Sequence, residues 1–132
     1  MASRGTTVPE SLNVLSGQIV DAAYRVHARM GPGLLENVYE VCLEYELQKK
    51  GLQVERQVPL ELVYDSLRFD VAYRLDVVVE RQIIVEVKTV ETVLPVHKAQ
   101  LKTYLKLSGY RLGLLLNFNT PLIKDGITRI AV

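Results

Sequence analysis

Three charged side chains stand out in a mostly apolar stretch of the chain, residues 74–88 (RLDVVVERQIIVEVK): Asp76, Glu86 and Lys88. A charge inside an apolar strand is costly in free energy unless it is paired, solvated or bound to a metal ion. Two carboxylates with a lysine nearby are what a metal-dependent phosphodiesterase needs, because a hard divalent cation prefers carboxylate and phosphate oxygens. This chemistry requires that the fold bring the three side chains together.

The same stretch predicts two β-strands joined by a tight turn of about three residues, 80–82. Directly opposed residues have Cβ atoms about 4.5–5.5 Å apart, so opposed carboxylates repel unless a divalent cation lies between them. Lys88 would share the face of the carboxylates, since strand side chains alternate. A turn one residue longer or shorter would break this register. The expected pairs are Val79 with Ile83, Val77 with Val85, and Asp76 with Glu86.

Length and composition indicate one compact domain. The chain has 132 residues, 48% hydrophobic and 23% charged, which is ordinary for a globular protein with a real core. Its net charge is +1, whereas proteins that wrap nucleic acid usually carry a clear basic excess. No apolar run reaches the ~20 residues of a membrane span, and the N-terminus lacks a signal-peptide pattern. With Cys42 as the single cysteine, we expect a cytoplasmic protein.

Hydrophobic periodicity predicts an α/β fold. Residues 1–10 are expected to form a flexible tail and residues 11–132 a single domain, with Ser11 or Asn13 capping the first helix. The order α-α-β-β-β-α-β-β predicts a mixed central β-sheet flanked by helices. The expected elements are helices over 11–30, 34–50 and 95–108, and strands over 54–64, 67–79, 82–89, 111–118 and 127–132.

The second predicted helix carries apolar residues at helical spacing. Its first turn holds Glu36, a position where a carboxylate also interacts favourably with the helix dipole. The residues expected to face inward are Leu35, Val38, Cys42, Tyr45 and Leu47.

At this point the motifs resemble a known family. Residues 33–39 (GLLENVY) match the G-x-x-E-x-x-Y signature of the GxxExxY proteins. Asp76, the segment 86–88 (EVK) and the segment 100–104 (QLKTY) resemble the PD-(D/E)XK nuclease superfamily, in which that family is placed. The resemblance covers roughly residues 12–132 and implies a restriction-endonuclease-like fold. Leu75 stands where the superfamily motif has proline, a position that varies widely.

The resemblance implies a metal-dependent nuclease site with Mg²⁺ or Mn²⁺ as cofactor. Asp76, Glu86 and the carbonyl of Val87 would hold the metal ion. Lys88 would hold the attacking water or stabilise negative charge on the phosphate. Glu36 would reach the same site directly or through water. Taken singly, each of these charges also has a simpler interpretation as a solvated or helix-capping residue.

Further residues are accessory candidates. Gln100 and Tyr104 lie four apart on one helical face, and His97 precedes them by one turn, so they could orient Lys88 or the scissile phosphate. His27 is the other histidine; a hydrogen-bonded helix residue is the commoner role, and Arg25 stands where the family often has an acid. A stripe of lysines at helical spacing forms either a solvated face or a set of phosphate contacts. Its members are Lys98, Lys102 and Lys106.

We therefore expect a deoxyribonuclease, dependent on Mg²⁺ or Mn²⁺, that acts as a homo-oligomer. The apolar end of the chain (Ile127, Ile130, Val132) is a candidate for self-association. One alternative is a catalytically inactive assembly protein that keeps the nuclease fold, which the near-neutral charge favours. Another is a junction-resolving dimer. The residues leave open whether the substrate is DNA or RNA, linear or branched, and whether it is cut at an end or inside.

Overall fold

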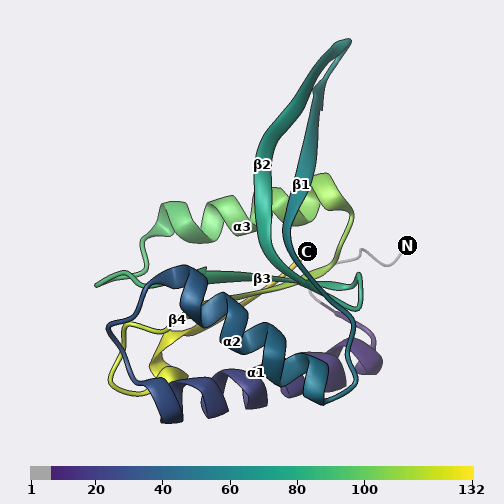
Figure 1. The fold of residues 1–132 in the computed structure, drawn as a ribbon. Coiled ribbons are helices and arrows are strands. Elements are labelled where there is room, and N and C mark those ends of the chain that lie inside the picture. The colour runs from purple at the N-terminus through teal and green to yellow at the C-terminus, as the bar shows by residue number, and fades with distance from the viewer. Residues whose placement is uncertain (1–6) are drawn as a thin grey trace.

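A computed structural model describes residues 7–132, apart from the side chains of Val71 and Ala72 (Figure 1). Most of the predicted tail, residues 1–6, lies outside the described residues. The first helix, α1 (Glu10–Met30), begins at Glu10, and its N-cap residue is Pro9, not Ser11 or Asn13. The carbonyl of Pro9 accepts the first main-chain hydrogen bonds of the helix, so no side-chain cap is used.

The element order is the predicted one, and the fold class is confirmed. Five strands form one mixed sheet in the order β1-β2-β3-β4-β5, in which only β3 and β4 are parallel. Within residues 7–132, no helix is both long and apolar enough to cross a lipid bilayer. The elements after α1 are α2 (Glu36–Lys49), β1 (Val54–Tyr64), β2 (Leu67–Val79), β3 (Ile83–Lys88), α3 (Pro95–Ser108), β4 (Leu112–Asn117), the 3₁₀ helix η1 (Ile123–Gly126) and β5 (Ile127–Ala131).

Helices cover both faces of the sheet: α1 and α2 pack on one, and α3 packs on the other (Figure 1). Because strand side chains alternate, β3 supplies both cores. Val85 packs with α1 and α2, whereas Ile84 packs with α3. All six residues of β4 are buried. Strands buried on both faces have continuous apolar runs, which is what the sequence of β4 predicts.

The hairpin of β1 and β2 leaves the sheet and projects beyond the body of the molecule (Figure 1). The alternation of β2 side chains between the two cores breaks where the hairpin leaves the sheet. Leu75 and Val77 are two residues apart on β2, yet they pack in opposite cores. The facing strand holds Gln57 with a φ of 54°, a left-handed conformation that is uncommon for residues other than glycine. The hairpin therefore changes its inward face at this level.

The inward face of α2 differs from the predicted one. Leu35 and Tyr45 are 72% and 60% exposed, so the expectation that they face inward was wrong. The buried stripe is Tyr39, Leu43 and Leu47 at intervals of four residues. This face is rotated by about 100°, one residue of an α-helix, from the expected stripe.

Tyr39 closes the turn between the first two helices. Its hydroxyl donates to the carbonyl of Gly31. It also accepts a hydrogen bond from the main-chain N–H of Leu34 at 3.2 Å. The ring stacks on Phe118 with centroids 4.4 Å apart. These contacts fix the start of α2 against the end of β4.

Asn117 at the end of β4 holds the segment that follows β3. Its amide group donates to the carbonyl of Val90 and accepts from the N–H of Val90, at 2.9 and 3.1 Å. Gly126 packs against the main chain of Asn117 so closely that a Cβ there would lie 2.1 Å from the Asn117 carbonyl oxygen. Only glycine fits at this position.

Gly126→Ala should therefore lower the free energy of unfolding by about 1–3 kcal/mol or more, because an added methyl group would force the main chain of β4 to move. Urea denaturation measures this. Gly17→Ala is the matched control, since its Cβ would meet nothing within 4 Å on the exposed side of α1. That change should raise stability by about 0.5–1 kcal/mol. Equal stability of Gly126→Ala and wild type would contradict the packing described.

Candidate functional site

Asp76 lies at the point where β2 separates from β3. The predicted pairs Val79–Ile83 and Val77–Val85 are present, and Val77–Val85 is the last pair of the ladder. Asp76 does not form the next pair with Glu86. Its Oδ2 instead accepts a hydrogen bond from the main-chain N–H of Val87 at 2.9 Å. The carboxylate thus satisfies a buried strand N–H, a group that is costly to leave without a partner.

Glu86 is a buried acid beside Asp76. The side chain is only 5% exposed, and its Oε1 has no hydrogen-bond partner among the described residues. Burial and then the neighbouring Asp76 carboxyl, against the opposing charge of Lys88, together raise the pKa of Glu86 to about 10. Two carboxyl groups this close cannot both ionise at neutral pH without a compensating positive charge.

Lys88 lies on β3, the same strand as Glu86, and supplies a positive charge near the acid pair. It is half-buried, and its charge lowers the pKa of Glu86. Its main-chain carbonyl accepts from the N–H of Phe118 at 2.9 Å, which fixes the end of β3. Within the described part of the chain, its ammonium group makes no hydrogen bond or ion pair. The ammonium is therefore available to a ligand.

Tyr104 approaches the acid pair from α3. Burial, and then the charges of Glu86 and Asp76, raise the pKa of Tyr104 to about 12. Its ring contacts Tyr73 of the hairpin, with centroids 5.6 Å apart. The hydroxyl therefore stays protonated at neutral pH and can donate a hydrogen bond toward the acidic groups.

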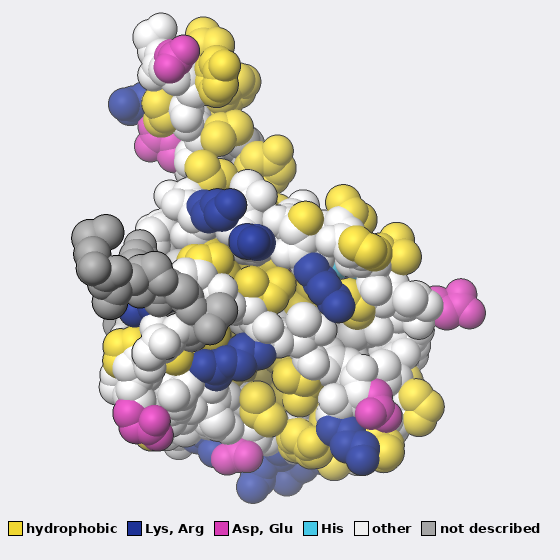
Figure 2. All heavy atoms as spheres, turned by 180° about the vertical axis from the view of Figure 1, so that it is seen from behind, with side chains coloured by type: hydrophobic (Ala, Val, Ile, Leu, Met, Phe, Trp, Pro, Cys, Tyr) yellow, Lys and Arg dark blue, Asp and Glu magenta, His cyan; other side chains and the backbone are white. Residues whose placement is uncertain are grey.

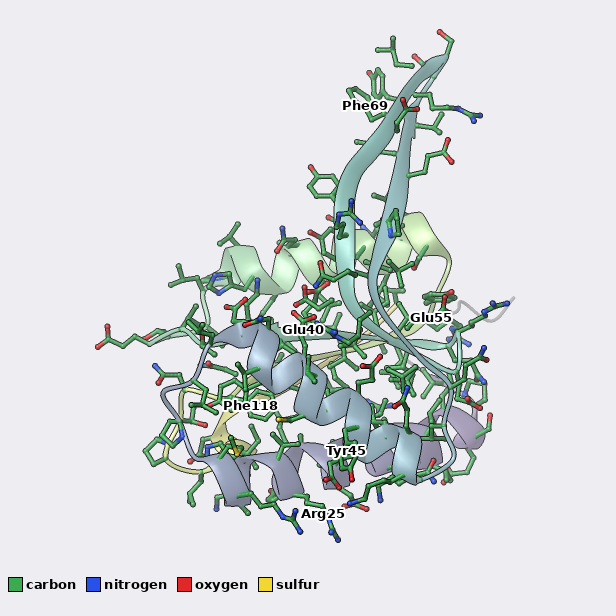
Figure 3. All side chains as sticks on the ribbon, viewed as in Figure 1. Arg25, Glu40, Tyr45, Glu55, Phe69 and Phe118 are labelled. Atoms are coloured by element: carbon green, nitrogen blue, oxygen red, sulfur yellow. The ribbon has the colours of Figure 1, made fainter. Side chains whose placement is uncertain are left out.

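Glu40 is a further acid at the site that the sequence reasoning missed. It is 4% exposed and lies on the side of α2 that faces the strands (Figure 3). Its Oε1 accepts from Nε2 of Gln57 at 2.9 Å and lies 3.5 Å from Nη2 of Arg56. Burial raises its pKa, and the charge of Asp76 adds to the rise. Its position one helical turn after Glu36 was the signal that could have revealed it.

Glu36 joins the site only at its edge. Its Oε2 accepts from the N–H of Thr89 at 3.2 Å and lies 3.5 Å from the Thr89 hydroxyl. It therefore connects the start of α2 to the end of β3. The structure does not gather it with Asp76 and Glu86 into one cluster, because the main chain after Lys88 holds its carboxylate.

The two histidines have structural contacts. Nε2 of His27 lies 2.8 Å from the carbonyl oxygen of Thr120, and its ring stacks near Phe118. Nδ1 of His97 accepts from the N–H of Leu94 at 3.0 Å and so caps the start of α3. Neither belongs to a cluster of potential metal ligands among residues 7–132.

The remaining predicted residues lie on α3. Gln100 is exposed one turn before Tyr104. Lys98, Lys102 and Lys106 are all exposed. Lys102 follows Gln100 by two residues, a rotation of about 200° around the helix axis. The lysine stripe therefore occupies the flank of α3 opposite the Gln100–Tyr104 face.

The ligand set for a metal ion is small. No group of three or more His, Cys, Asp or Glu side chains in the described part of the chain could hold a metal ion. Asp76 and Glu86 form an adjacent pair. Mg²⁺ commonly takes only one or two protein carboxylates and completes its octahedron with waters and substrate phosphates. The chemistry of the pair fits such an ion.

Comparison with known proteins gives one match. The family model of the PD-(D/E)XK nuclease superfamily matches residues 13–130, which include every site residue described above. No curated protein and no solved structure matches.

The raised pKa of Glu86 predicts how stability depends on pH. In the folded chain Glu86 keeps its proton up to pH about 10, whereas the value for a free glutamate is 4.5. Between these values the folded state binds more protons, so raising the pH favours the unfolded state. Near pH 4 the free energy of unfolding of Glu86→Gln should equal that of wild type. At pH 8 in EDTA it should be higher than that of wild type by about 1 kcal/mol or more.

Urea denaturation at both pH values checks this prediction, and exposed Glu91→Gln serves as the control for loss of one charge. An equal pH dependence of Glu86→Gln and wild type would show that Glu86 ionises normally.

Proposed function

Because this chain belongs to the PD-(D/E)XK nuclease superfamily, we propose that it hydrolyses phosphodiester bonds of DNA with the help of Mg²⁺ or Mn²⁺. One observation carries the proposal. The half-buried Asp76 and the buried Glu86 form an acid pair where two strands separate, and Lys88 lies on the same strand as Glu86. In the proposed hydrolysis the acids would hold the metal ion, and the ammonium group would stabilise negative charge.

The pair is suited to a divalent cation. Glu86 Oε1 is buried and has no hydrogen-bond partner in the part of the chain that the structure describes, and an unpartnered buried acid oxygen is rare in folded proteins. Asp76, Glu86 and the Val87 carbonyl would hold the ion. When bound, the ion neutralises the acid pair and polarises the phosphate and a water.

The other side chains position the reactants. Hydrolysis needs a water aimed at phosphorus and a donor for the negative charge that develops on the phosphate oxygens. The free ammonium of Lys88 can hold that water or contact a phosphate oxygen. Tyr104 can donate a hydrogen bond toward the acid pair, and Gln100, one helical turn earlier, is exposed and available for substrate contact. Glu40, held by Gln57 and Arg56, places a further negative charge next to Asp76.

Membership of the GxxExxY family is a further proposal, supported by the contacts of residues 33–39. Gly33 has a φ of 105°, which favours glycine. Glu36 accepts from Thr89, and Tyr39 closes the turn at Gly31 and Leu34. Each letter of the signature therefore has a physical role in joining α1 and α2 to the site.

Two properties of the whole protein stay proposals. A cytoplasmic location is consistent with the free thiol of Cys42. Self-association would enlarge the surface available to grip DNA. Ile127 and Ala131 are half-buried against one core, and Ile130 and Val132 against the other. The end of the chain thus has limited apolar surface left for a partner.

The alternative function is that of an inactive nuclease-fold assembly protein. The absence of a three-residue metal cluster in the described residues favours it. Calorimetric titration with Mn²⁺ separates the two functions: the nuclease proposal expects binding by wild type and loss of binding in Glu86→Ala. No binding by wild type would support the alternative.

Asp76→Ala and Lys88→Ala should each reduce Mg²⁺- or Mn²⁺-dependent cleavage of DNA by about 10²-fold or more, because each removes a group that stabilises the transition state. Labelled linear, single-stranded and branched DNA, with RNA alongside, are the substrates. Preference for branched DNA would identify a junction resolvase. Asp21→Ala and Lys124→Ala, exposed and distant in sequence from the site, are matched controls.

Circular dichroism verifies that the variants fold. Cleavage by Asp76→Ala at the wild-type rate would rule out the proposed site.

A further inference from the structure

The end of the β1–β2 hairpin, residues 61–70, carries apolar side chains that nothing in the described chain covers. We call this segment the hairpin tip. Tyr64 and Leu67 are 68% and 58% exposed, and Val63 and Phe69 are about half exposed. Figure 2 shows hydrophobic side chains along the projecting arm. Apolar residues gathered on a projecting element usually become buried against a partner.

The charge of the hairpin tip narrows the choice of partner. Glu61 and Arg68 neutralise one another at 3.1 Å. Asp65 and Asp70 have no ion-pair partner among the described residues. An apolar tip with two excess negative charges is unsuited to a phosphate backbone. It suits an apolar surface with a basic rim.

The chain itself has such a surface between α1 and α2. A groove of about 310 Å³ opens there, and we call it the helical groove. Met30, Val41 and Tyr45 are each 45–60% exposed in it. Its lining residues are Val26, Arg29, Met30, Val41, Cys42, Tyr45 and Glu46.

The rim of the helical groove is basic. Arg25 and Lys49 both contact Oε1 of Glu46, at 3.6 and 3.4 Å, so two cations share one carboxylate. Arg29 has no ion-pair partner within residues 7–132. The rim therefore carries excess positive charge that complements Asp65 and Asp70 of the hairpin tip. Complementary charges of this kind orient association between proteins.

Within one chain the two surfaces cannot meet. Figure 3 places Phe69 near the end of the projecting hairpin, and Tyr45 and Arg25 at the opposite end of the molecule. The paired strands β1 and β2 connect the hairpin tip to the sheet.

We propose that the hairpin tip of one copy of this chain docks into the helical groove of a second copy, with its apolar side chains buried and its aspartates against the basic rim. The contact joins two different surfaces, so it is heterologous. Such a contact closes into a dimer or ring, or propagates, according to the rotation between copies.

Two charge-introducing variants test this proposal by analytical ultracentrifugation. Leu67→Asp alters the hairpin tip, and Val41→Asp alters the helical groove; both replace exposed side chains. Wild type should self-associate within a range of about 1 µM to 1 mM. Each variant should weaken association by about tenfold or more. The control, Val14→Asp, places the same charge at an exposed valine of α1 and should self-associate like wild type.

Mixing the two variants is the decisive step. Leu67→Asp retains an intact groove and Val41→Asp an intact tip, so an equimolar mixture should associate more strongly than either variant alone. Failure of the mixture to associate would overturn the proposal. A monomeric wild type would also overturn it. Self-association of Val41→Asp at the wild-type level would overturn it too, because it would indicate a tip-to-tip contact. Loss of DNA binding in Leu67→Asp with self-association intact would make the hairpin a substrate arm and also overturn it.

Discussion

The hydrogen bond from the Val87 N–H to Asp76 Oδ2 is the interaction on which the rest of the site depends. Where β2 turns away with the hairpin, β3 keeps a buried main-chain donor that needs an acceptor. A carboxylate on the departing strand supplies it. The same bond holds the Asp76 carboxyl next to Glu86, so the departure of the hairpin and the assembly of the acid pair have one structural cause.

The acid pair then determines what surrounds it. A carboxyl buried beside another acid needs a proton or a cation, and Glu86 Oε1 has no hydrogen-bond partner among residues 7–132. Both helical layers contribute: Glu40 approaches Asp76 from α2, and Tyr104 approaches both acids from α3. Asp76 is accessible from both layers because the hairpin changes its inward face at this residue. Buried charge of this kind is a recurrent feature of functional sites.

Local patterns predicted the elements well, since alternation marks 67–79 as a strand and Pro95 and Gly109 bound a helix. Strand register likewise predicted the pairs Val79–Ile83 and Val77–Val85, but the ladder ends there, so the predicted Asp76–Glu86 pair was wrong and Asp76 binds the Val87 N–H instead. Contacts between distant segments were not predictable. The face of α2 depends on the stacking of Tyr39 on Phe118, so Leu35 and Tyr45 were misplaced and Glu40 was missed. The left-handed conformation lies at Gln57, where no glycine signals it, and the Glu36–Thr89 contact joins residues 53 positions apart.

A crystal soaked with Mn²⁺ and measured near the manganese absorption edge tests the central claim most directly. The account predicts an anomalous peak between Asp76 and Glu86, about 2.0–2.2 Å from an oxygen of each carboxylate. A fully occupied Mn²⁺ elsewhere on the chain with none between these two acids, or soaked crystals in which the pair keeps its metal-free arrangement with no peak, would contradict it.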